Sequence, residues 1–227
     1  MVGGIVLAAV AIAAVLIAIS SGGGSSSNTK VSSSQWNTVN ALLGGIPQNG
    51  SVLGNANAPV TMTYYGDLQC PVCQQFTLNG GLSDLIKNEV RQGKVKIDYK
   101  SFQTATQDPN VFKEQQVAAL AAGQQKRFWD YAELFYRNQG TENSGYVTES
   151  FLQSIAKHIP PLNLPAWESS RNNQALTAEV AADVASGNAK GVSGTPTLIF
   201  NGPKGQAVSP QAVPSYSDLQ QEINKVS

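Results

Sequence analysis

The sequence is poor in the residues that carry most metal and enzyme chemistry. Its 227 residues include only two cysteines, Cys70 and Cys73, and a single histidine. A tetrahedral structural zinc site needs four such ligands, so one chain cannot complete it. The C-x-x-C spacing would be half of a zinc site whose other half is missing. We therefore expect no metal site.

Charged residues are also scarce. They make up 13% of the chain, and 15 basic residues balance 15 acidic ones. Proteins that bind nucleic acid usually show a basic surplus, because they neutralise phosphates. The balance therefore argues against nucleic acid as a partner. The sequence also lacks the acidic run that is typical of a disordered tail.

One long stretch carries no charge at all. Residues 2–19 read VGGIVLAAVAIAAVLIAI, which as a helix would be about 27 Å long, close to the thickness of a bilayer core. We interpret residues 1–20 as a transmembrane anchor. The alternative is a cleaved signal peptide, because residues 18–20 loosely fit a cleavage site. Either way we expect export, with the rest of the chain anchored on the extracytoplasmic side of the cell membrane or secreted.

Residues 21–44 lack the pattern of a folded core. They begin with SGGGSSSNTK, a Gly/Ser tract that behaves as a flexible tether. A lead-in segment with apolar anchors follows, and we expect it to lie across the surface of the domain. That domain is expected to occupy residues 45–227.

The remaining pattern predicts an α/β fold. Short β-branched or alternating runs predict strands, and apolar residues at helical spacing predict helices. Strands are expected at residues 59–67, 94–102, 196–202 and 206–209, and helices at 71–90, with a break near Gly80-Gly81, throughout 108–190, and at 215–226. The block at 108–190 is too long for one crossover, so it indicates an inserted all-helical subdomain in an α/β sheet domain.

The two cysteines follow the first predicted strand. At i and i+3 on the first helical turn they share one face, so their sulfurs can meet. Cys70 would lie at the helix N-terminus, where free N–H groups stabilise a thiolate, and Pro71 suits the first helical position. Cys73, one turn in, is placed as the more buried, resolving thiol. This division suits thiol–disulfide exchange. An inert structural disulfide is the alternative, although so short a loop stabilises little.

Two further positions bear on this chemistry. Thr195-Pro196 begins the predicted strand at 196–202, where proline is tolerated; the functional interpretation is a cis proline packed against the sulfurs, with the Thr195 backbone free to pair with a substrate strand. Asp67 ends the first strand. It could shuttle the proton of Cys73, but an aspartate after glycine is more often a turn or capping residue, which we favour.

Three motifs together resemble a known family. LGNANAPVTMTYYGDLQCPVCQQF, GQQKRFWDYAELFYRNQG and GVSGTPTLIFNG are similar, in this order, to the DsbA-like thiol–disulfide oxidoreductases, in particular the membrane-tethered bacterial type. The resemblance runs from about Gly45 to the C-terminus. It implies a thioredoxin fold with a helical insertion, preceded here by the transmembrane helix. It also implies Cys70 as nucleophile, Cys73 as resolving thiol and Thr195-Pro196 as a cis-proline loop.

The resemblance also implies an activity and partners. We expect a protein dithiol oxidase that introduces disulfides into unfolded or reduced exported proteins without any cofactor. A membrane quinone-linked partner, DsbB-like or vitamin K epoxide reductase-like, would reoxidise the pair. One departure concerns direction: strong oxidases of the family often carry histidine within the active-site dipeptide, where this chain has Val72. A reductase or isomerase of the same fold, and a non-enzymatic peptide-binding module with a structural disulfide, are the alternatives.

Overall fold

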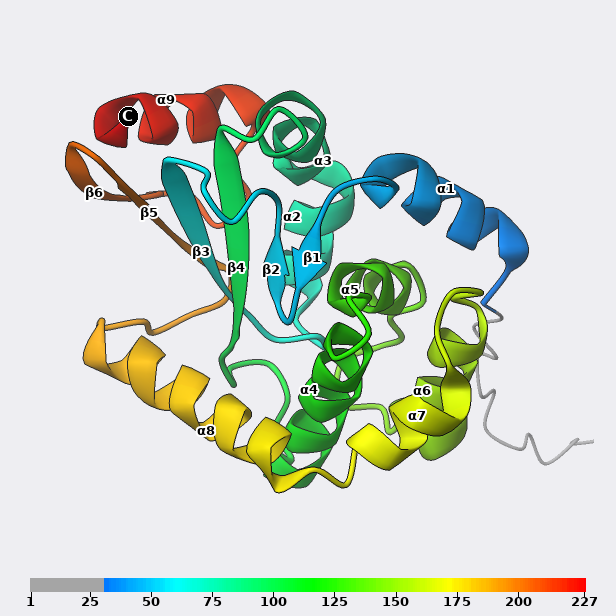
Figure 1. The fold of residues 1–227 in the computed structure, drawn as a ribbon. Coiled ribbons are helices and arrows are strands. Elements are labelled where there is room, and N and C mark those ends of the chain that lie inside the picture. Colours follow the sequence, from blue (N-terminus) through cyan, green and yellow to red (C-terminus); the bar gives the residue numbers. More distant parts are fainter. Residues whose placement is uncertain (1–30) are drawn as a thin grey trace, which may run out of the picture.

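The computed structural model describes residues 31–227, which build one mixed sheet surrounded by helices (Figure 1). The strand order is β1-β2-β4-β3-β5-β6. The strands are β1 Gln48–Asn49, β2 Val52–Leu53, β3 Val60–Gly66, β4 Val95–Ser101, β5 Thr197–Gly202 and β6 Gly205–Val208. The helices are α1 Ser33–Leu43, α2 Pro71–Asn79, α3 Leu82–Leu85 with the π-helical turn Ile86–Val90, α4 Pro109–Gly123, α5 Phe128–Arg137, α6 Glu149–Lys157, α7 Leu164–Ser170, α8 Gln174–Ala189 and α9 Tyr216–Val226.

The centre of the sheet is the pair β3 and β4, which run parallel in register from Val60↔Val95 to Gly66↔Ser101. All the other pairings are antiparallel. β3 is buried on both faces towards its C-terminal end, as its aromatic and apolar sequence requires. The four strands and the break at Gly80 predicted above are confirmed, because α2 ends at Asn79.

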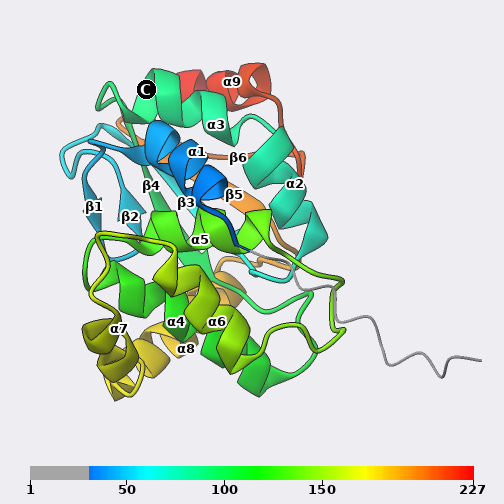
Figure 2. The ribbon, with the colours of Figure 1, turned by 90° about the vertical axis from the view of Figure 1, so that its right-hand side faces the viewer.

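The helical insertion follows β4 and returns to β5. Its five described helices, α4 to α8, are the predicted block, and Asp108 caps α4 with its carboxylate on two main-chain N–H groups. α4, α6, α7 and α8 lie at the end of the molecule opposite α3 and α9 (Figures 1 and 2). The predicted stripe Phe128, Tyr131 and Phe135 is buried, and so is every other residue of α5 except Arg137.

The lead-in segment differs from its prediction. Residues 33–43 form α1, which packs against α5 and buries Val39, Leu42 and Leu43. Ser32 and Gln35 start this helix with a reciprocal capping box. β1 and β2 were not predicted either. The folded part of the described chain thus begins before residue 45.

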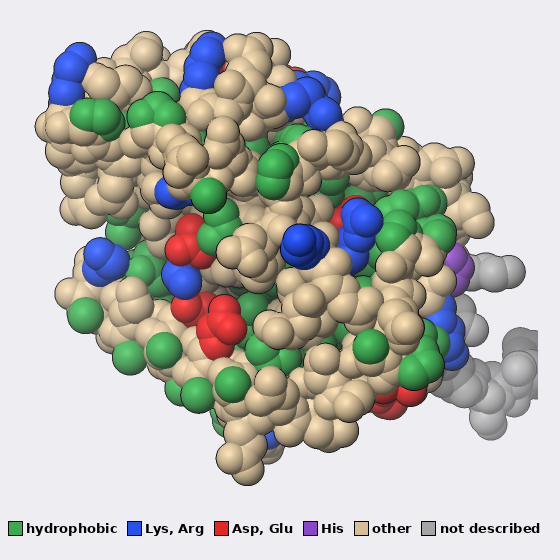
Figure 3. Space-filling model, viewed as in Figure 1, with side chains coloured by type: hydrophobic (Ala, Val, Ile, Leu, Met, Phe, Trp, Pro, Cys, Tyr) green, Lys and Arg blue, Asp and Glu red, His purple; other side chains and the backbone are tan. Residues whose placement is uncertain are grey.

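The described residues 31–227 include no helix long and apolar enough to cross a bilayer. The predicted anchor at residues 1–20 and the Gly/Ser tract lie outside this range. On the face shown in Figure 3, uncharged polar groups and backbone dominate and charged side chains are scattered, as the low charge content leads one to expect.

Candidate active site

The end of β3 places both cysteines. β3 stops at Gly66, a loop of three residues follows, and Cys70 is the N-cap of α2. Pro71 occupies the first helical position, where its missing N–H costs nothing. The Cys70 sulfur accepts a hydrogen bond from the Cys73 main-chain N–H at 3.3 Å, so the thiol itself caps the helix.

The two thiols have opposite electrostatic environments. The pKa of Cys70 is lowered to about 6 by a hydrogen bond from the Cys73 thiol, helped by the Thr195 side chain and the main-chain N–H groups of Val72 and Cys73, against the effect of burial. Burial raises the pKa of Cys73 well above its ordinary value, and the neighbouring Cys70 raises it further. Both are free thiols in the structure. Cys70 is therefore the more readily ionised of the two thiols.

Cys70 is less accessible than the sequence predicted. It keeps 4% of its surface exposed and Cys73 none. Val72, between them, is 38% exposed and is one of the few exposed large apolar residues in the described chain.

The start of β5 completes the site. The Thr195–Pro196 peptide bond is cis, and the thiol of Cys70 donates a hydrogen bond to the Thr195 carbonyl oxygen at 3.3 Å. The antiparallel pairing of β5 with β3 opposes Thr197 to Tyr65 and so brings this turn beside the end of β3. The structure thus brings together Cys70, Cys73 and Thr195 with the flanking residues Pro71, Val72 and Pro196.

Asp67 is the buried anchor of this region. Its carboxylate is fully buried and accepts the main-chain N–H of Gln69 at 3.0 Å. It also accepts three successive N–H groups of the loop after β4, those of residues 104–106, at 2.8–3.2 Å, and the hydroxyl of Thr106 at 2.6 Å. The side-chain amide of Gln115 supplies one more donor at 3.0 Å. These contacts agree with the turn or capping role that the sequence favoured for Asp67.

Two glutamines fasten the helical insertion to the active-site loop, and no sequence pattern indicated them. The Gln139 amide donates to the carbonyl oxygens of Leu68 at 2.7 Å and Cys70 at 3.2 Å. In return, the Gln74 amide donates to the Tyr136 carbonyl at 2.7 Å. The start of α2 is therefore held from the end of α5.

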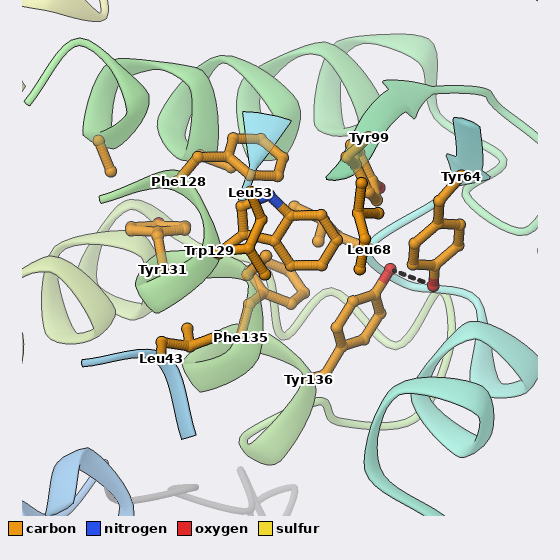
Figure 4. Packing of buried hydrophobic residues seen from close by; sticks show 14 of the residues in the cluster. Leu43, Leu53, Tyr64, Leu68, Tyr99, Phe128, Trp129, Tyr131, Phe135 and Tyr136 are labelled. Carbon is orange, nitrogen blue, oxygen red and sulfur yellow. Dashed lines mark hydrogen bonds between the residues drawn. The ribbon is translucent and has the colours of Figure 1, made fainter. Parts of the chain in front are cut away.

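Buried aromatic residues belong to the same core cluster as the two cysteines. The hydroxyls of Tyr64, on β3, and Tyr136, on α5, approach to 3.4 Å (Figure 4). Both residues are fully buried, and burial raises both pKa values well above the ordinary tyrosine range. Neutral, packed rings here keep water away from Cys73 and so maintain the difference between the two thiols.

Neither the cavities nor the metal-ligating side chains of the described residues indicate a second functional site. Residues 31–227 contain no cluster of three or more His, Cys, Asp or Glu side chains that could hold a metal ion. A cavity of about 760 Å³ lies within the insertion, between residues such as Glu149 and Arg171, and neither cysteine lines it. A smaller cavity, about 240 Å³, is lined by Gln69 and Thr106 and so adjoins the residue before Cys70.

Comparisons with known proteins agree with this geometry. Residues 47–221 match the protein family described as Thioredoxin. The probable disulfide bond formation protein D of Bacillus cereus is 25% identical over 180 residues, which cover 76% of each chain. Among solved structures, oxidised BdbD from Bacillus subtilis superposes with a TM-score of 0.67 at 22% identity, covering 80% of this chain and 95% of that one. DsbA2 of Pseudomonas aeruginosa gives a TM-score of 0.59 at 22% identity, covering 79% and 95%. The chain therefore belongs to the thioredoxin family, and it is similar to a probable disulfide bond formation protein and, in fold, to DsbA-type proteins.

Proposed function

We propose that this protein introduces disulfides into exported proteins through a redox pair formed by Cys70 and Cys73. The observation that carries the proposal is the contrast between the two thiols at one helix N-terminus. A lowered pKa of about 6 at Cys70 means that the Cys70 thiolate is stable and leaves readily from a mixed disulfide. Because this thiolate belongs to the reduced form, its stability also makes the disulfide form more oxidising. The relatives named for disulfide bond formation support the same direction.

The exchange runs in two balanced steps. A substrate thiolate attacks the Cys70 sulfur of the oxidised pair, forming a mixed disulfide while Cys73 leaves as a thiolate and takes up a proton. A second substrate thiolate then attacks the substrate sulfur of the mixed disulfide, and Cys70 leaves as its stabilised thiolate. The substrate has lost two electrons and gained a disulfide, and the protein holds the two electrons as a dithiol.

Thr195 and Pro196 are proposed to hold the substrate. Strand β5 begins beside Cys70, and the Thr195 main chain is placed to pair with an extended substrate segment, as in recognition by strand addition. The exposed side chain of Val72 offers an apolar contact at the same opening. Pro71 and Val72 thus act as the active-site dipeptide.

Regeneration and location complete the proposal. A membrane quinone-linked partner, DsbB-like or vitamin K epoxide reductase-like, would take the two electrons from Cys70–Cys73. The apolar run at residues 2–19 would anchor the folded domain on the extracytoplasmic side. Fractionation of the full-length chain tests this location: recovery with membranes is expected, and a mature chain in the medium that begins after residue 20 contradicts it.

One observation favours a second candidate, a reductase of the same fold. Val72 brings no positive charge to the Cys70 thiolate, whereas an imidazolium at this position would stabilise it. A loss of about 1.4 kcal/mol would lower the potential by about 30 mV for this couple. The chain would then be a weaker oxidant than relatives with histidine.

Single-cysteine variants test the exchange mechanism. With a reduced, unfolded substrate protein, Cys73→Ser should accumulate a mixed disulfide through Cys70, because no resolving thiol competes with the substrate. Cys70→Ser should form none and should lose dithiol oxidation entirely. A trapped complex through Cys73 instead, or oxidation by Cys70→Ser at the wild-type rate, contradicts the assigned roles. Retained peptide affinity without redox activity in the wild type would favour the binding module.

A further inference from the structure

A pocket beside the active-site loop takes no part in the exchange steps proposed above. Its volume is about 240 Å³, and it is lined by Gln69, the residue before Cys70, and by Thr106 of the loop after β4. Two residues before Thr106, the hydroxyl of Thr104 is hydrogen-bonded to that of Thr195. The pocket therefore flanks the place where a substrate cysteine would meet Cys70, and it belongs to the same site.

The walls of this pocket are fixed by hydrogen bonds within the protein. Asn143 lines it from the segment between α5 and α6. Its side-chain oxygen accepts the main-chain N–H of Gln107 at 2.9 Å, and its side-chain nitrogen donates to the carbonyl oxygen of Ala105 at 3.0 Å. Thr106 is held from behind by the buried Asp67 carboxylate, through its N–H at 2.8 Å and its hydroxyl at 2.6 Å. A pocket that is formed in advance binds with little ordering cost.

Gln69 brings an unused hydrogen-bond donor to the pocket. Its side chain is buried, with 3% of the residue exposed, and its Oε1 accepts the main-chain N–H of Asn143 at 3.2 Å. A main-chain N–H only donates, so this bond fixes which end of the amide is oxygen and which is nitrogen. The nitrogen, Nε2, has no hydrogen-bond partner within residues 31–227. A buried donor without a partner costs free energy, so an acceptor that enters the pocket recovers it.

The other lining groups define the chemistry of the occupant. Asp108 contributes a carboxylate whose Oδ1 caps α4, while its Oδ2 has no hydrogen-bond partner within residues 31–227. Val111 and Val147 add apolar surface, and in the described part of the chain no basic side chain lines the pocket. A carboxamide side chain matches this set, because its oxygen accepts from Gln69, its N–H₂ donates to Asp108 and its methylene groups contact the valines. A carboxylate would be repelled by Asp108, and an ammonium group would leave the Gln69 donor unpaired.

We propose that this pocket is a specificity subsite that takes the carboxamide side chain of a glutamine or asparagine within two residues of the substrate cysteine. The distance follows from the chain, since Gln69 is next to Cys70 and an extended substrate advances about 3.3 Å per residue. The inference rests on the proposed exchange through Cys70 and adds to it a feature of the substrate sequence.

The test lets peptides compete for Cys70. The full-length Cys73→Ser chain, in mild detergent, first carries glutathione in a mixed disulfide with Cys70. A peptide thiolate then attacks the Cys70 sulfur and glutathione leaves as a thiolate, so that one disulfide replaces another. Single-cysteine peptides carry Gln, Glu, Lys or Leu at one of the two positions on either side of the cysteine. Mass spectrometry counts the peptides bound at equilibrium, and each ratio is divided by the ratio that the same peptides give with glutathione disulfide alone.

At one of these positions we expect Gln to exceed Leu about three- to tenfold, the size of one hydrogen bond, and to exceed Glu and Lys by at least as much. Asp108→Asn preserves the helix cap, since asparagine caps as well as aspartate, and should abolish the preference for Gln over Glu. Asp84→Asn, an equal loss of charge at an exposed position on α3, should leave it unchanged. Val147→Phe fills the pocket and should abolish every preference.

The subsite is overturned if all four side chains bind equally at every position, if the preference survives Val147→Phe, or if Asp108→Asn behaves like Asp84→Asn. These outcomes leave the exchange through Cys70 intact. A Cys70 that forms no mixed disulfide even with glutathione would instead contradict the proposed function itself, and the subsite with it.

Discussion

At the scale of single residues, the site depends on two sulfurs with the same chemistry and different surroundings. Cys70 caps a helix and accepts a hydrogen bond from the Cys73 main-chain N–H, whereas Cys73, three residues on, is fully buried. Helix N-terminal N–H groups lower a thiol pKa and burial raises it. The sequence predicted this asymmetry, because the motif puts Cys70 at the helix N-terminus and Cys73 one turn further in on the same face.

The pH dependence of Cys70 follows from its pKa of about 6. The reduced protein should react with iodoacetamide at Cys70 at a rate that rises about tenfold per pH unit below pH 6 and levels off above it, since the thiolate is the nucleophile. Mass spectrometry locates the label. In Cys73→Ala the plateau should shift towards pH 9, because the Cys73 thiol is the main cause of the lowered pKa. A wild-type rate still rising between pH 7 and 9 would be inconsistent with this assignment.

Asp67 should matter for stability. Asp67→Asn places an amide N–H₂ among main-chain N–H donors and weakens six hydrogen bonds, so unfolding free energy should fall by about 2–4 kcal/mol in a denaturant titration. Asp84→Asn, which removes half of an exposed ion pair with Lys87, should cost less than about 0.5 kcal/mol. Unchanged stability with slower disulfide exchange would instead favour the proton shuttle considered from the sequence.

At the scale of elements, short or distant features escaped prediction. β1 and β2 have two residues each, which is too short for any periodicity to be recognised. The bond between Thr104 and Thr195 spans 91 positions, and that from Gln139 to Leu68 spans 71. Nothing local in the chain encodes such pairs. Longer segments such as β3, β4 and α5 were predictable, because their own composition and apolar spacing indicate the element.

Helix α1 shows how a core element can be overlooked. Its apolar residues follow a Gly/Ser tract and read as isolated anchors, yet Leu43 is 2% exposed and packs in the main core. We expect Leu43→Ala to lower the unfolding free energy by about 2–4 kcal/mol, through lost burial and a residual cavity. The exposed control Asn37→Ala on the same helix should change it by less than about 0.5 kcal/mol. Equal, small effects of both variants would mean that α1 is not part of the cooperative unit.

At the scale of the whole molecule, the sheet and the helical insertion meet at the active site. Cys70 follows the central strand β3, Thr195 precedes β5, and Gln139, just after α5, holds the loop between β3 and α2. The roles of the six named site residues stay predictions, whereas the thioredoxin fold was predictable from three ordered motifs. The coupling of the insertion to the loop was not, because it depends on how two distant parts of the chain dock.

The central claim is that this geometry makes the couple an oxidant, and the reduction potential of Cys70–Cys73 tests it most directly. The full-length chain is equilibrated in glutathione buffers and its thiols are trapped and counted. We predict a value well above the glutathione poise, closer to about −120 mV than to about −270 mV. A potential near about −270 mV would contradict the oxidase assignment and identify the protein as a reductase.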